Sequence, residues 1–391
     1  ELRTAAMKLP ITVGYVSVDD PTDRRTWSGT NHFLLRSLQQ QVASVKVLGP
    51  LRPQPALFLC QAINQVMLRT VGKRFNYRDS FVMARAYAGI LGPLLHDVDL
   101  IIAPAGLATT ALLRTKAPII HVNDRCIAGA LGYHRILNDL AAFSQQESLA
   151  LEQQALKNAA LTVYASQWAA DAAIQAAPEQ AYKVKVVPFG ANLEQMPSVP
   201  EVRRFPSERI KLLFLGVNWG DKGGPIALQA LQELRRRGVG AQLVVCGCTP
   251  PTSDADVDMI CEGFLDKNDP VQAKRLEEHL RTADLLILPT RFEAYGIVCC
   301  EAAAYGLPVL ATRTGGIPTI VQDGITGHLF DMDEDGVAYA DRVLQLVQAP
   351  ETWQTMRNKA RKRFEEVLNW TAFTRELLRL AQEARSDNNA R

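Results

Sequence analysis

The chain has 391 residues, more than the roughly 250 to 300 at which one hydrophobic core stops growing, so two domains are expected. Hydrophobic residues make up 47% and charged residues 21%, an ordinary globular composition that excludes a disordered chain. The net charge is +2, with 19 Lys and Arg against 14 Asp and Glu in residues 1–195 and 24 against 27 in residues 196–391. Polyanion binders carry blocks of like charge, and none is present, so we expect no nucleic-acid partner.

Cysteines and apolar segments indicate the cellular setting. Seven cysteines lie scattered without C-x-x-C pairs or nearby histidines, which argues against a disulfide framework and a zinc site. No apolar stretch approaches the ~18 residues of a membrane span, and the first ten residues lack the apolar core of a signal peptide. A cytoplasmic protein is therefore expected. The basic patch from Arg69 to Arg85 is either a solvated helix face or a peripheral contact with anionic lipids at the inner membrane face.

In the first half of the chain, short β-branched runs alternate with helical patterns. Buried parallel strands read as continuous apolar runs, and their alternation with helices predicts a doubly wound sheet. The predicted strands are 11–18, 98–105, 117–122, 161–165 and 184–189, and the predicted helices include 31–41, 107–114 and 137–158.

The alternation of strands and helices stops at residue 190 and restarts after residue 209. Residues 190–209 contain three prolines and no periodicity, so we predict domains at 1–195 and 210–369 with a linker at 196–209. The fold class is then α/β, with two Rossmann-like domains facing each other across a deep cleft that is lined by the carboxyl ends of their strands. The second set of strands is predicted at 211–216, 241–247, 283–289 and 307–312, and the helices include 271–282, 351–367 and 371–386.

Two carboxylates follow the strand at 283–289, in R-F-E-A-Y-G-I-V-C-C-E (291–301). Gly296 lets the backbone turn into a helix, whose open N-terminus favours a phosphate or diphosphate. Glu293 lies just outside that N-terminus and Glu301 lies a little over one turn inside it. We expect Glu301 to bind a ribose diol and Glu293 the hydroxyls of a sugar. The alternative is a helix-capping Glu293 and a surface Glu301.

A second loop, G-V-N-W-G-D-K-G-G (216–224), follows the strand that ends at Gly216. The next helix begins near Gly223, so Lys222 lies beside the same cleft and could neutralise a departing diphosphate. The spacing matches neither G-x-G-x-x-G nor G-x-x-x-x-G-K-[ST], which argues against nicotinamide redox chemistry and against a P-loop. An exposed loop lysine is the alternative.

Loops of the first half also follow strands. W-S-G-T-N (27–31) places Gly29 where backbone approaches a ligand closely. Asp124 and Asn192 each follow a predicted strand and are further candidates. His121 lies near the end of its strand, where core packing is as well supported as a role in the site.

Together these segments resemble the family-4 retaining glycosyltransferases of the GT-B fold (glycosyl transferases group 1), over nearly the whole chain. The resemblance rests on S-G-T, A-S-Q-W-A-A (165–170), V-V-P-F-G-A-N (186–192), the K-G-G loop, and above all E-A-Y-G-I-V-C-C-E followed by A-x-G-L-P-V-L-A and G-I-T-G-H-L-F. It implies an enzyme that moves a sugar, with retention of configuration, from a nucleotide-diphosphate sugar to a hydroxyl of a glycan, lipid-linked or small-molecule acceptor. It also implies that the last helix, 370–391, crosses back to the first domain.

The resemblance assigns roles to the candidates. Glu301 would hold the nucleotide ribose, Glu293 the donor sugar and Lys222 the diphosphate. The other donor-binding residues would be Gly29, Gly216, Asn218, Leu265, Ala294, Tyr295, Gly296 and Ile297. The acceptor-side candidates are Asp124, His121 and Asn192.

The chain departs from the family where Val217 and Asn218 follow Gly216, because many relatives have an arginine there that clamps the diphosphate together with the lysine. Either Asn218 or a distant basic residue takes that place. Lys222 and a helix N-terminus could stabilise the leaving group without help, so we expect no metal ion and no cofactor besides the donor. The alternatives are a sugar-nucleotide epimerase or a phosphorylase on the same fold, a nicotinamide oxidoreductase, and a non-catalytic sugar-binding protein.

Overall fold

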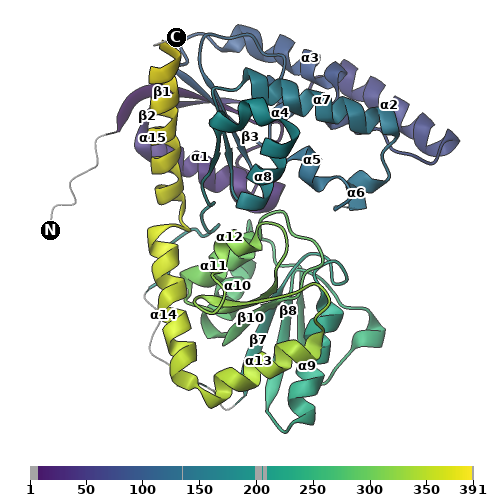
Figure 1. Cartoon of the computed structure of the whole chain (residues 1–391), viewed down its shortest axis with the longest axis vertical. Coiled ribbons are helices and arrows are strands. Elements are labelled where there is room, and N and C mark those ends of the chain that lie inside the picture. Colours follow the sequence, from purple (N-terminus) through teal and green to yellow (C-terminus); the bar gives the residue numbers. More distant parts are fainter. Residues whose placement is uncertain (1–7, 134, 199–204, 206–208, 390–391) are drawn as a thin grey trace. The chain divides into compact units, whose positions relative to one another are not determined.

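The computed structural model describes residues 8–133, 135–198, 205 and 209–389, which form two compact α/β units (Figure 1). Each unit is built on a six-stranded sheet in which all strand pairs are parallel. The first unit holds the described residues up to Val187 and those from Phe373 onward, and the second unit is Pro188–Ala372. The predicted class of two doubly wound α/β domains is confirmed.

The first sheet has the strand order β2-β1-β3-β4-β5-β6. All residues of β3, β4 and β5 are buried, as expected for parallel strands covered by helices on both faces. The strand order reverses between β1 and β3, which makes this the switch point of the sheet. The strands are β1 (Leu9–Val16), β2 (Val42–Leu48), β3 (Leu100–Pro104), β4 (Ile119–Asn123), β5 (Leu161–Tyr164) and β6 (Val184–Val186).

Helices cover the first sheet and include the end of the chain. The Ser37 hydroxyl lies 2.8 Å from that of Thr374, which joins the last helix to the first. The helix predicted at 107–114 ends earlier, at Thr110, and the Asn158 side chain donates to the carbonyls of Thr110 and Leu113 beyond its end. The helices are α1 (Thr30–Gln41), α2 (Gln54–Thr70), α3 (Phe81–Leu91), α4 (Leu107–Thr110), α5 (Ile127–Ala130), α6 (Arg135–Asn138), α7 (Ala142–Asn158), α8 (Gln167–Ala176) and α15 (Trp370–Asn389).

The second sheet has the order β12-β11-β10-β7-β8-β9, which is the Rossmann order 3-2-1-4-5-6 read from its other edge. Its strands are β7 (Ile210–Leu215), β8 (Ala241–Cys246), β9 (Met259–Gly263), β10 (Leu285–Leu288), β11 (Val309–Thr312) and β12 (Gly327–Phe330). Its helices are α9 (Gly224–Arg236), α10 (Pro270–Thr282), α11 (Ile297–Ala304), α12 (Ile317–Ile320), α13 (Gly336–Gln348) and α14 (Pro350–Glu366).

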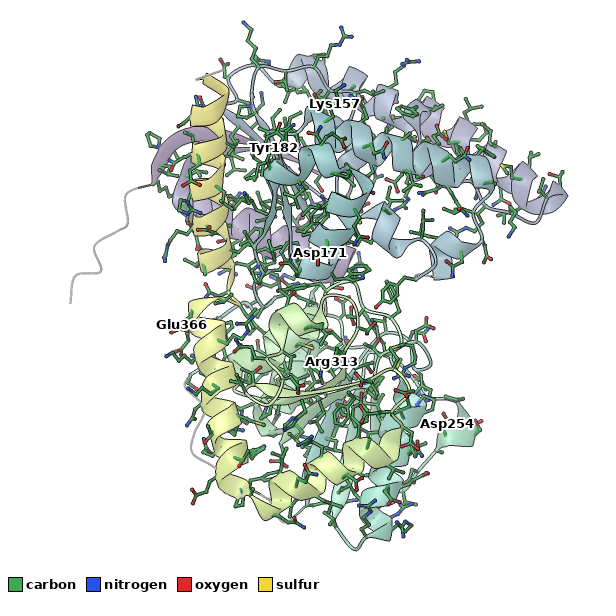
Figure 2. All side chains as sticks on the ribbon, viewed as in Figure 1. Lys157, Asp171, Tyr182, Asp254, Arg313 and Glu366 are labelled. Carbon is green, nitrogen blue, oxygen red and sulfur yellow. The ribbon has the colours of Figure 1, made fainter. Side chains whose placement is uncertain are left out.

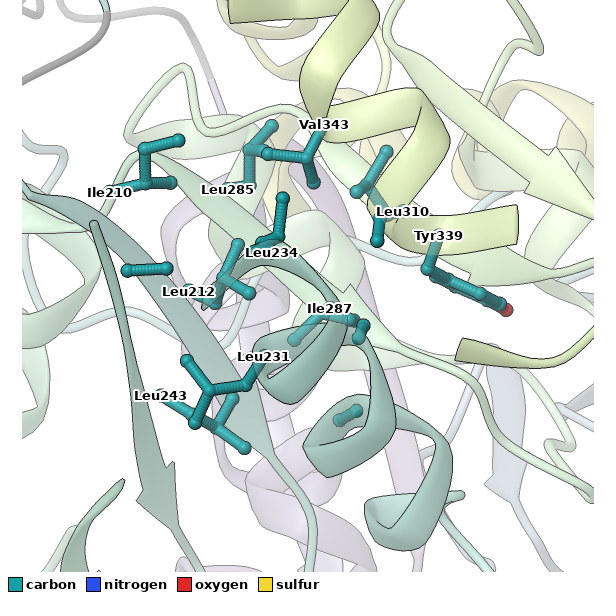
Figure 3. Packing of buried hydrophobic residues seen from close by; sticks show 14 of the residues in the cluster. Ile210, Leu212, Leu231, Leu234, Leu243, Leu285, Ile287, Leu310, Tyr339 and Val343 are labelled. Atoms are coloured by element: carbon teal, nitrogen blue, oxygen red, sulfur yellow. The ribbon is translucent and has the colours of Figure 1, made fainter. Parts of the chain in front are cut away.

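The core of the second unit lies between this sheet and helices α9 and α13 (Figure 3). Leu231 and Leu234 of α9 are fully buried, and they lie among the buried side chains of β7, β8 and β10. Trp353 of α14 is also fully buried, and its indole N–H donates to the carbonyl of Asp284 at 2.9 Å. Phe205, from the predicted linker, stacks on Trp353 with ring centroids 4.5 Å apart. The segment before β7 is therefore anchored in the core at this residue.

The boundary of the first unit lies earlier than the predicted residue 195. The Ala191 N–H donates to the carbonyl of Leu368 at 2.9 Å, and the Trp370 indole donates to the Asn192 amide oxygen at 2.9 Å. These bonds attach the segment after β6 to the second unit. In the described part of the chain, no helix is long and apolar enough to cross a membrane.

Candidate functional site

The candidate site lies at the carboxyl ends of β7 and β10, two neighbouring strands of the second sheet. The strand order reverses here, because β8 follows β7 on one side while β10 lies on the other. Open α/β sheets bind ligands at such switch points. The loop after β7 carries Lys222 and the loop after β10 carries Glu293, so the topology alone brings both residues to one place.

The two loops are bonded to each other. The Lys222 ammonium donates to Glu293 Oε2 at 2.7 Å and to the carbonyl of Phe292 at 3.2 Å. Their backbones are joined by the Arg291 N–H, which donates to the carbonyl of Asp221 at 2.8 Å. The side chains of Lys222 and Glu293 are 18% and 15% exposed, so the ion pair is partly shielded yet reachable from solvent. A cation and a carboxylate are thus fixed side by side at the carboxyl ends of these two central strands.

Two glycines make this close approach of the loops possible. Gly223 has φ +76°, and a Cβ at this position would lie 1.8 Å from the carbonyl oxygen of Pro289. Gly296, with φ +97°, precedes α11 and turns the chain from the loop into the helix. L-residues with a side chain rarely adopt such backbone angles. Both turns were predictable from these glycines in the sequence.

Helices α9 and α11 begin beside this pair. Gly223 is the residue before α9 and Gly296 is the residue before α11, and no described side chain caps either N-terminus. The first N–H groups of an α-helix have no partner within the helix and carry partial positive charge. The backbone of Gly296 and Ile297, together with the Lys222 ammonium, is therefore suited to an anion.

Glu301 lies inside α11 and is only 1% exposed, so it is not the surface residue of the alternative reading. Its carboxylate forms an ion pair with Lys267, which follows β9. Glu301 is therefore already paired in this structure, and its role in binding a ribose stays a prediction. Lys267 was not among the residues singled out from the sequence, although its place just after Leu265 and a strand end was a usable signal. Leu265 itself is half-buried in this loop.

The loop after β7 is held by its own side chains. Asn218 Oδ1 accepts from the N–H of Asp221 at 2.8 Å, which closes a turn ahead of Lys222. The Trp219 indole is buried and donates to Asp254 Oδ2 at 2.7 Å; Figure 2 marks Asp254. Gly216 is half-buried at the strand end. These bonds position Lys222, and the Asn218 amide oxygen is used for the turn.

Of the residues that precede α11, some side chains are buried in the core, and only backbone groups can face a ligand. The Tyr295 side chain is 3% exposed, and its hydroxyl donates to the carbonyl of Phe189 at 3.1 Å. Burial raises the pKa of Tyr295 well above its ordinary value, so the phenol stays protonated. Cys300 lies against the same hydroxyl, and burial raises the pKa of its thiol to about 12. Only the backbone of Tyr295 and of half-buried Ala294 remains as a candidate ligand.

In the first unit, the structure brings the loop of Gly29 close to Asp124. The Trp27 indole donates to Asp124 Oδ2 at 2.8 Å, joining the loop after β1 to the loop after β4. Trp27 and Ser28 have φ of +45° and +56°, which is strained for residues other than glycine. Gly29 follows them and is the residue before α1. Trp27 was not singled out from the sequence, although it lies two residues before Gly29.

Two acceptor-side candidates belong to the interior. Asn192 is 2% exposed, and its amide oxygen accepts from the Trp370 indole. His121 is fully buried in β4, and its Nε2 lies 2.6 Å from the Thr110 hydroxyl. Its Nδ1 has no hydrogen-bond partner among the described residues. Core packing, the reading left open for His121, is therefore the one that the structure supports.

Because of His121, we expect the free energy of unfolding to fall as the pH is lowered from about 6.5 towards about 3. Burial, helped by the positive charge of Lys183, lowers the pKa of His121 from 6.5 to about 3. The unfolded chain takes up a proton in this window while the folded chain does not, at a loss of about 1.4 kcal/mol per pH unit. Urea denaturation at several pH values measures how the free energy of unfolding depends on pH. His121→Gln, which cannot take up that proton, should lose this part of the pH dependence, and an unchanged slope would contradict the assignment.

A hollow of about 470 Å³ lies elsewhere, in the first unit, near the amino ends of β4, β5 and β6. Lys116, Lys157, Lys183 and Lys185 line it together with Tyr182; Figure 2 marks Lys157 and Tyr182. Ligands of open α/β sheets bind at the opposite, carboxyl edge. We therefore place the candidate site at the strand ends that carry Lys222 and Glu293, not in this hollow.

Two curated relatives are named D-inositol 3-phosphate glycosyltransferase. The one from Xylanimonas cellulosilytica is 33% identical over 177 residues, which is 41% of this chain and 42% of the relative. The one from Corynebacterium diphtheriae is 28% identical over 259 residues, 61% of this chain and 59% of the relative. The chain thus spans about half the length of these curated relatives. A shorter similarity, 38% over 99 residues, links 25% of this chain to 24% of the N-acetyl-alpha-D-glucosaminyl L-malate synthase of Bacillus anthracis.

Solved structures share the architecture. Sucrose-phosphate synthase from Thermosynechococcus elongatus has a TM-score of 0.65 at 16% identity, covering 96% of this chain and all of that one (100%). HepE of Anabaena, solved in complex with UDP and glucose, has a TM-score of 0.62 at 15% identity, covering 97% and 100%. Such low identities show the fold alone, which is that of the GT-B glycosyltransferases.

The family comparison covers the candidate site. Residues 196–363 match the family model described as glycosyl transferases group 1. The match contains Lys222, Glu293 and Glu301. Through this segment, the chain is similar to the glycosyl transferases group 1 family.

Proposed function

We propose that the chain is a retaining glycosyltransferase that moves a sugar from a nucleotide-diphosphate sugar to a hydroxyl acceptor. The observation that carries the proposal is the Lys222–Glu293 pair, 2.7 Å apart at the switch point of the second sheet and beside the start of α11. A diphosphate needs cationic and N–H groups, and a sugar needs carboxylates that accept from its hydroxyls. Lys222 and the helix N-terminus offer the groups for the diphosphate, and Glu293 offers the carboxylate for the sugar, all where the two loops meet.

In the proposed reaction, the bond between the sugar and the diphosphate breaks while negative charge grows on the leaving phosphate. The Lys222 ammonium and the N–H groups at the start of α11 stabilise that charge, without a metal ion. Groups fixed in advance towards a developing charge are commonly the largest source of catalysis. The acceptor hydroxyl forms the new bond to the sugar on the face that the leaving group occupied, and its proton passes to the departing phosphate.

Glu293 has two partners in this proposal. Without donor, its carboxylate holds Lys222 in place, and the bonds to Phe292 and Glu293 fix where the ammonium lies. A bound diphosphate competes for the same ammonium, which releases Glu293 to accept hydrogen bonds from the donor sugar. The Lys222 ammonium thus stays paired throughout, while the Glu293 carboxylate exchanges its ion pair for hydrogen bonds from neutral sugar hydroxyls.

The relatives guide the choice of donor and acceptor to be tested. HepE was solved with UDP and glucose, and the curated names mention inositol phosphate and malate, which are small polar acceptors. We propose a nucleotide-diphosphate sugar as donor. A small polar molecule, a glycan or a lipid-linked sugar is the proposed acceptor.

We expect one of the nucleoside diphosphates UDP, GDP and ADP, and the matching nucleotide sugar, to raise the melting temperature of the protein. A ligand that binds only the folded state at a hundred times its Kd adds about 2.7 kcal/mol of stability. Differential scanning fluorimetry with each nucleotide at equal concentration measures the shift. Lys222→Ala should reduce the shift, because it removes the cation that faces the diphosphate.

Incubation of the donor with and without candidate acceptors then separates the alternatives. A glycosyltransferase gives a new glycoside only when an acceptor is present, whereas an epimerase changes the donor by itself and a phosphorylase needs inorganic phosphate. If no nucleotide or nucleotide sugar shifts the melting temperature, the proposed donor site is wrong. If a nucleotide sugar binds but neither transfer nor hydrolysis follows with any acceptor class, the non-catalytic alternative replaces the enzyme.

A further inference from the structure

The outward face of α2 is apolar. Phe58, Leu59, Ala62, Ile63 and Val66 lie on it, and we call these five residues the α2 face. Phe58 is 76% and Val66 is 60% exposed. Soluble monomers rarely present apolar side chains in one contiguous patch unless the patch serves an interaction.

The spacing shows that the α2 face is one side of the helix, next to the side that packs on the core. The five residues recur at i, i+1, i+4, i+5 and i+8, which places them on one side of a helix. Cys60 is buried and Met67 half-buried on the other side, within the core formed with α3 and the first sheet. The apolar residues of α2 therefore extend beyond the side that the core covers, and those of the α2 face stay exposed. Figure 1 shows α2 along the margin of the first unit, beside α3.

Positive charge lies at the C-terminal end of this face. Between Arg24 and Arg78 the sequence contains no Asp or Glu. Residues 24–123 contain twelve Lys and Arg against three Asp, although the whole chain is only +2. Arg69 lies in the last turn of α2, and exposed Lys73 and Arg78 follow it in the connection to α3. The apolar face therefore ends in a cluster of cations.

We propose that the α2 face docks the first unit on the surface of an anionic lipid bilayer. The five apolar side chains would enter the boundary between head groups and acyl chains, while Arg69, Lys73 and Arg78 would contact lipid phosphates. Interfacial helices combine an apolar side with flanking cations in this way. The contact is peripheral, since none of the described helices could span a membrane. This inference does not depend on the proposed catalytic activity.

Charge complementarity favours a bilayer over a second copy of the chain. In a symmetric dimer across the α2 face, each copy would present an identical patch. Helix α2 and its connection up to Arg78 contain no Asp or Glu that could pair with Arg69, Lys73 and Arg78 of the other copy. An anionic lipid surface instead provides negative charge over the whole area, next to an apolar phase that accepts Phe58 and Val66.

Vesicle flotation with the full chain tests the proposal. The probes are extruded vesicles of phosphatidylcholine alone and of an equal mixture with phosphatidylglycerol. We expect the protein to float with the mixed vesicles, to bind the neutral ones much more weakly, and to lose binding as salt is raised, because surface charges are screened. Equal binding to both vesicles, or binding to neither, would overturn the proposal.

The apolar contribution is tested with Phe58→Ser combined with Val66→Ser. Partitioning onto mixed vesicles should fall roughly tenfold or more, since two apolar side chains no longer leave water. Val257→Ser with Val271→Ser is the matched control, because these valines are 92% and 77% exposed in the other unit. All four positions are exposed, so folding should be retained, and circular dichroism checks it. Equal partitioning of the two double variants would exclude the α2 face as the contact.

The charge contribution is tested with Arg69→Gln combined with Lys73→Gln. Each cation removed near an anionic surface should weaken partitioning about fivefold. The control is Lys274→Gln with Lys359→Gln, two exposed lysines of the second unit.

Sedimentation velocity without lipid tests whether a second copy of the chain, not a bilayer, covers the α2 face. A dimer that dissociates in the Phe58→Ser and Val66→Ser variant would assign the face to a second copy and reject the bilayer.

Discussion

Lys222→Ala should lower the turnover of the nucleotide sugar about a hundredfold, within a range of roughly tenfold to a thousandfold. Lys222 Nζ lies 2.7 Å from Glu293 Oε2 at the place where we propose that the diphosphate leaves. Loss of a group that stabilises a developing charge lowers kcat more than it raises KM, because the interaction strengthens in the transition state. Steady-state kinetics with the donor found by the melting screen measures both constants.

Lys211→Gln is the matched control for this prediction. Lys211 belongs to the same strand, β7, but lies near its amino end, where its ammonium donates to the Thr282 hydroxyl. Turnover should change little in this variant. Lys222→Arg keeps the positive charge and should retain part of the activity. If Lys222→Ala turns over donor as fast as the unchanged protein does, Lys222 has no role in the mechanism.

Gly223→Ala should destabilise the second unit by roughly 3 to 5 kcal/mol and abolish turnover. The added Cβ would lie 1.8 Å from the carbonyl oxygen of Pro289, closer than any atoms can approach without bonding. The chain must therefore move the β7 loop away from the end of β10. That movement separates Lys222 from Glu293, so stability and activity should fail together. Urea denaturation and donor turnover measure the two effects.

Gly238→Ala separates the clash from the backbone angle. Gly238 has φ +78°, nearly the same as the +76° of Gly223, but a Cβ there would meet nothing within 4 Å. Gly238→Ala should therefore lower the free energy of unfolding by only about 1 to 2 kcal/mol, the cost of placing a residue with a side chain in the left-handed conformation. A similar loss in both variants would show that the contact with Pro289 does not constrain the loops.

The interior strands could be predicted from the sequence, whereas three of the four strands at sheet edges could not. β3, β4, β5, β7, β8, β10 and β11 are central and read as continuous apolar runs. β2, β9 and β12 are edge strands and were not predicted. In β2 the sequence V-A-S-V-K-V-L has exposed residues between buried ends, so it lacks the buried run that marks a central strand. The edge strand β6 was predicted from its β-branched run V-K-V-V, whereas the other three are recognised by their neighbours, which the local sequence does not contain.

The candidate site was predictable where it depends on the chain's own turns. Gly223 and Gly296, each followed by a helical pattern, marked the loops of Lys222 and Glu293. The partners of buried polar groups were not predictable in the same way. Lys267 lies 34 positions from Glu301, and Trp27 lies 97 positions from Asp124. Only the packing of distant strands decides which polar groups meet.

The sequence by itself determined two α/β domains, the order of their central strands along the chain, and the loops that carry Lys222 and Glu293. It could do so because apolar runs, glycine turns and helix starts are local properties of the chain. Tertiary structure alone decided that His121 and Asn192 are interior residues, that Glu301 is paired with Lys267, and that one side of α2 stays uncovered. Burial and pairing depend on residues far away in the sequence, since a side chain is buried only by what folds against it.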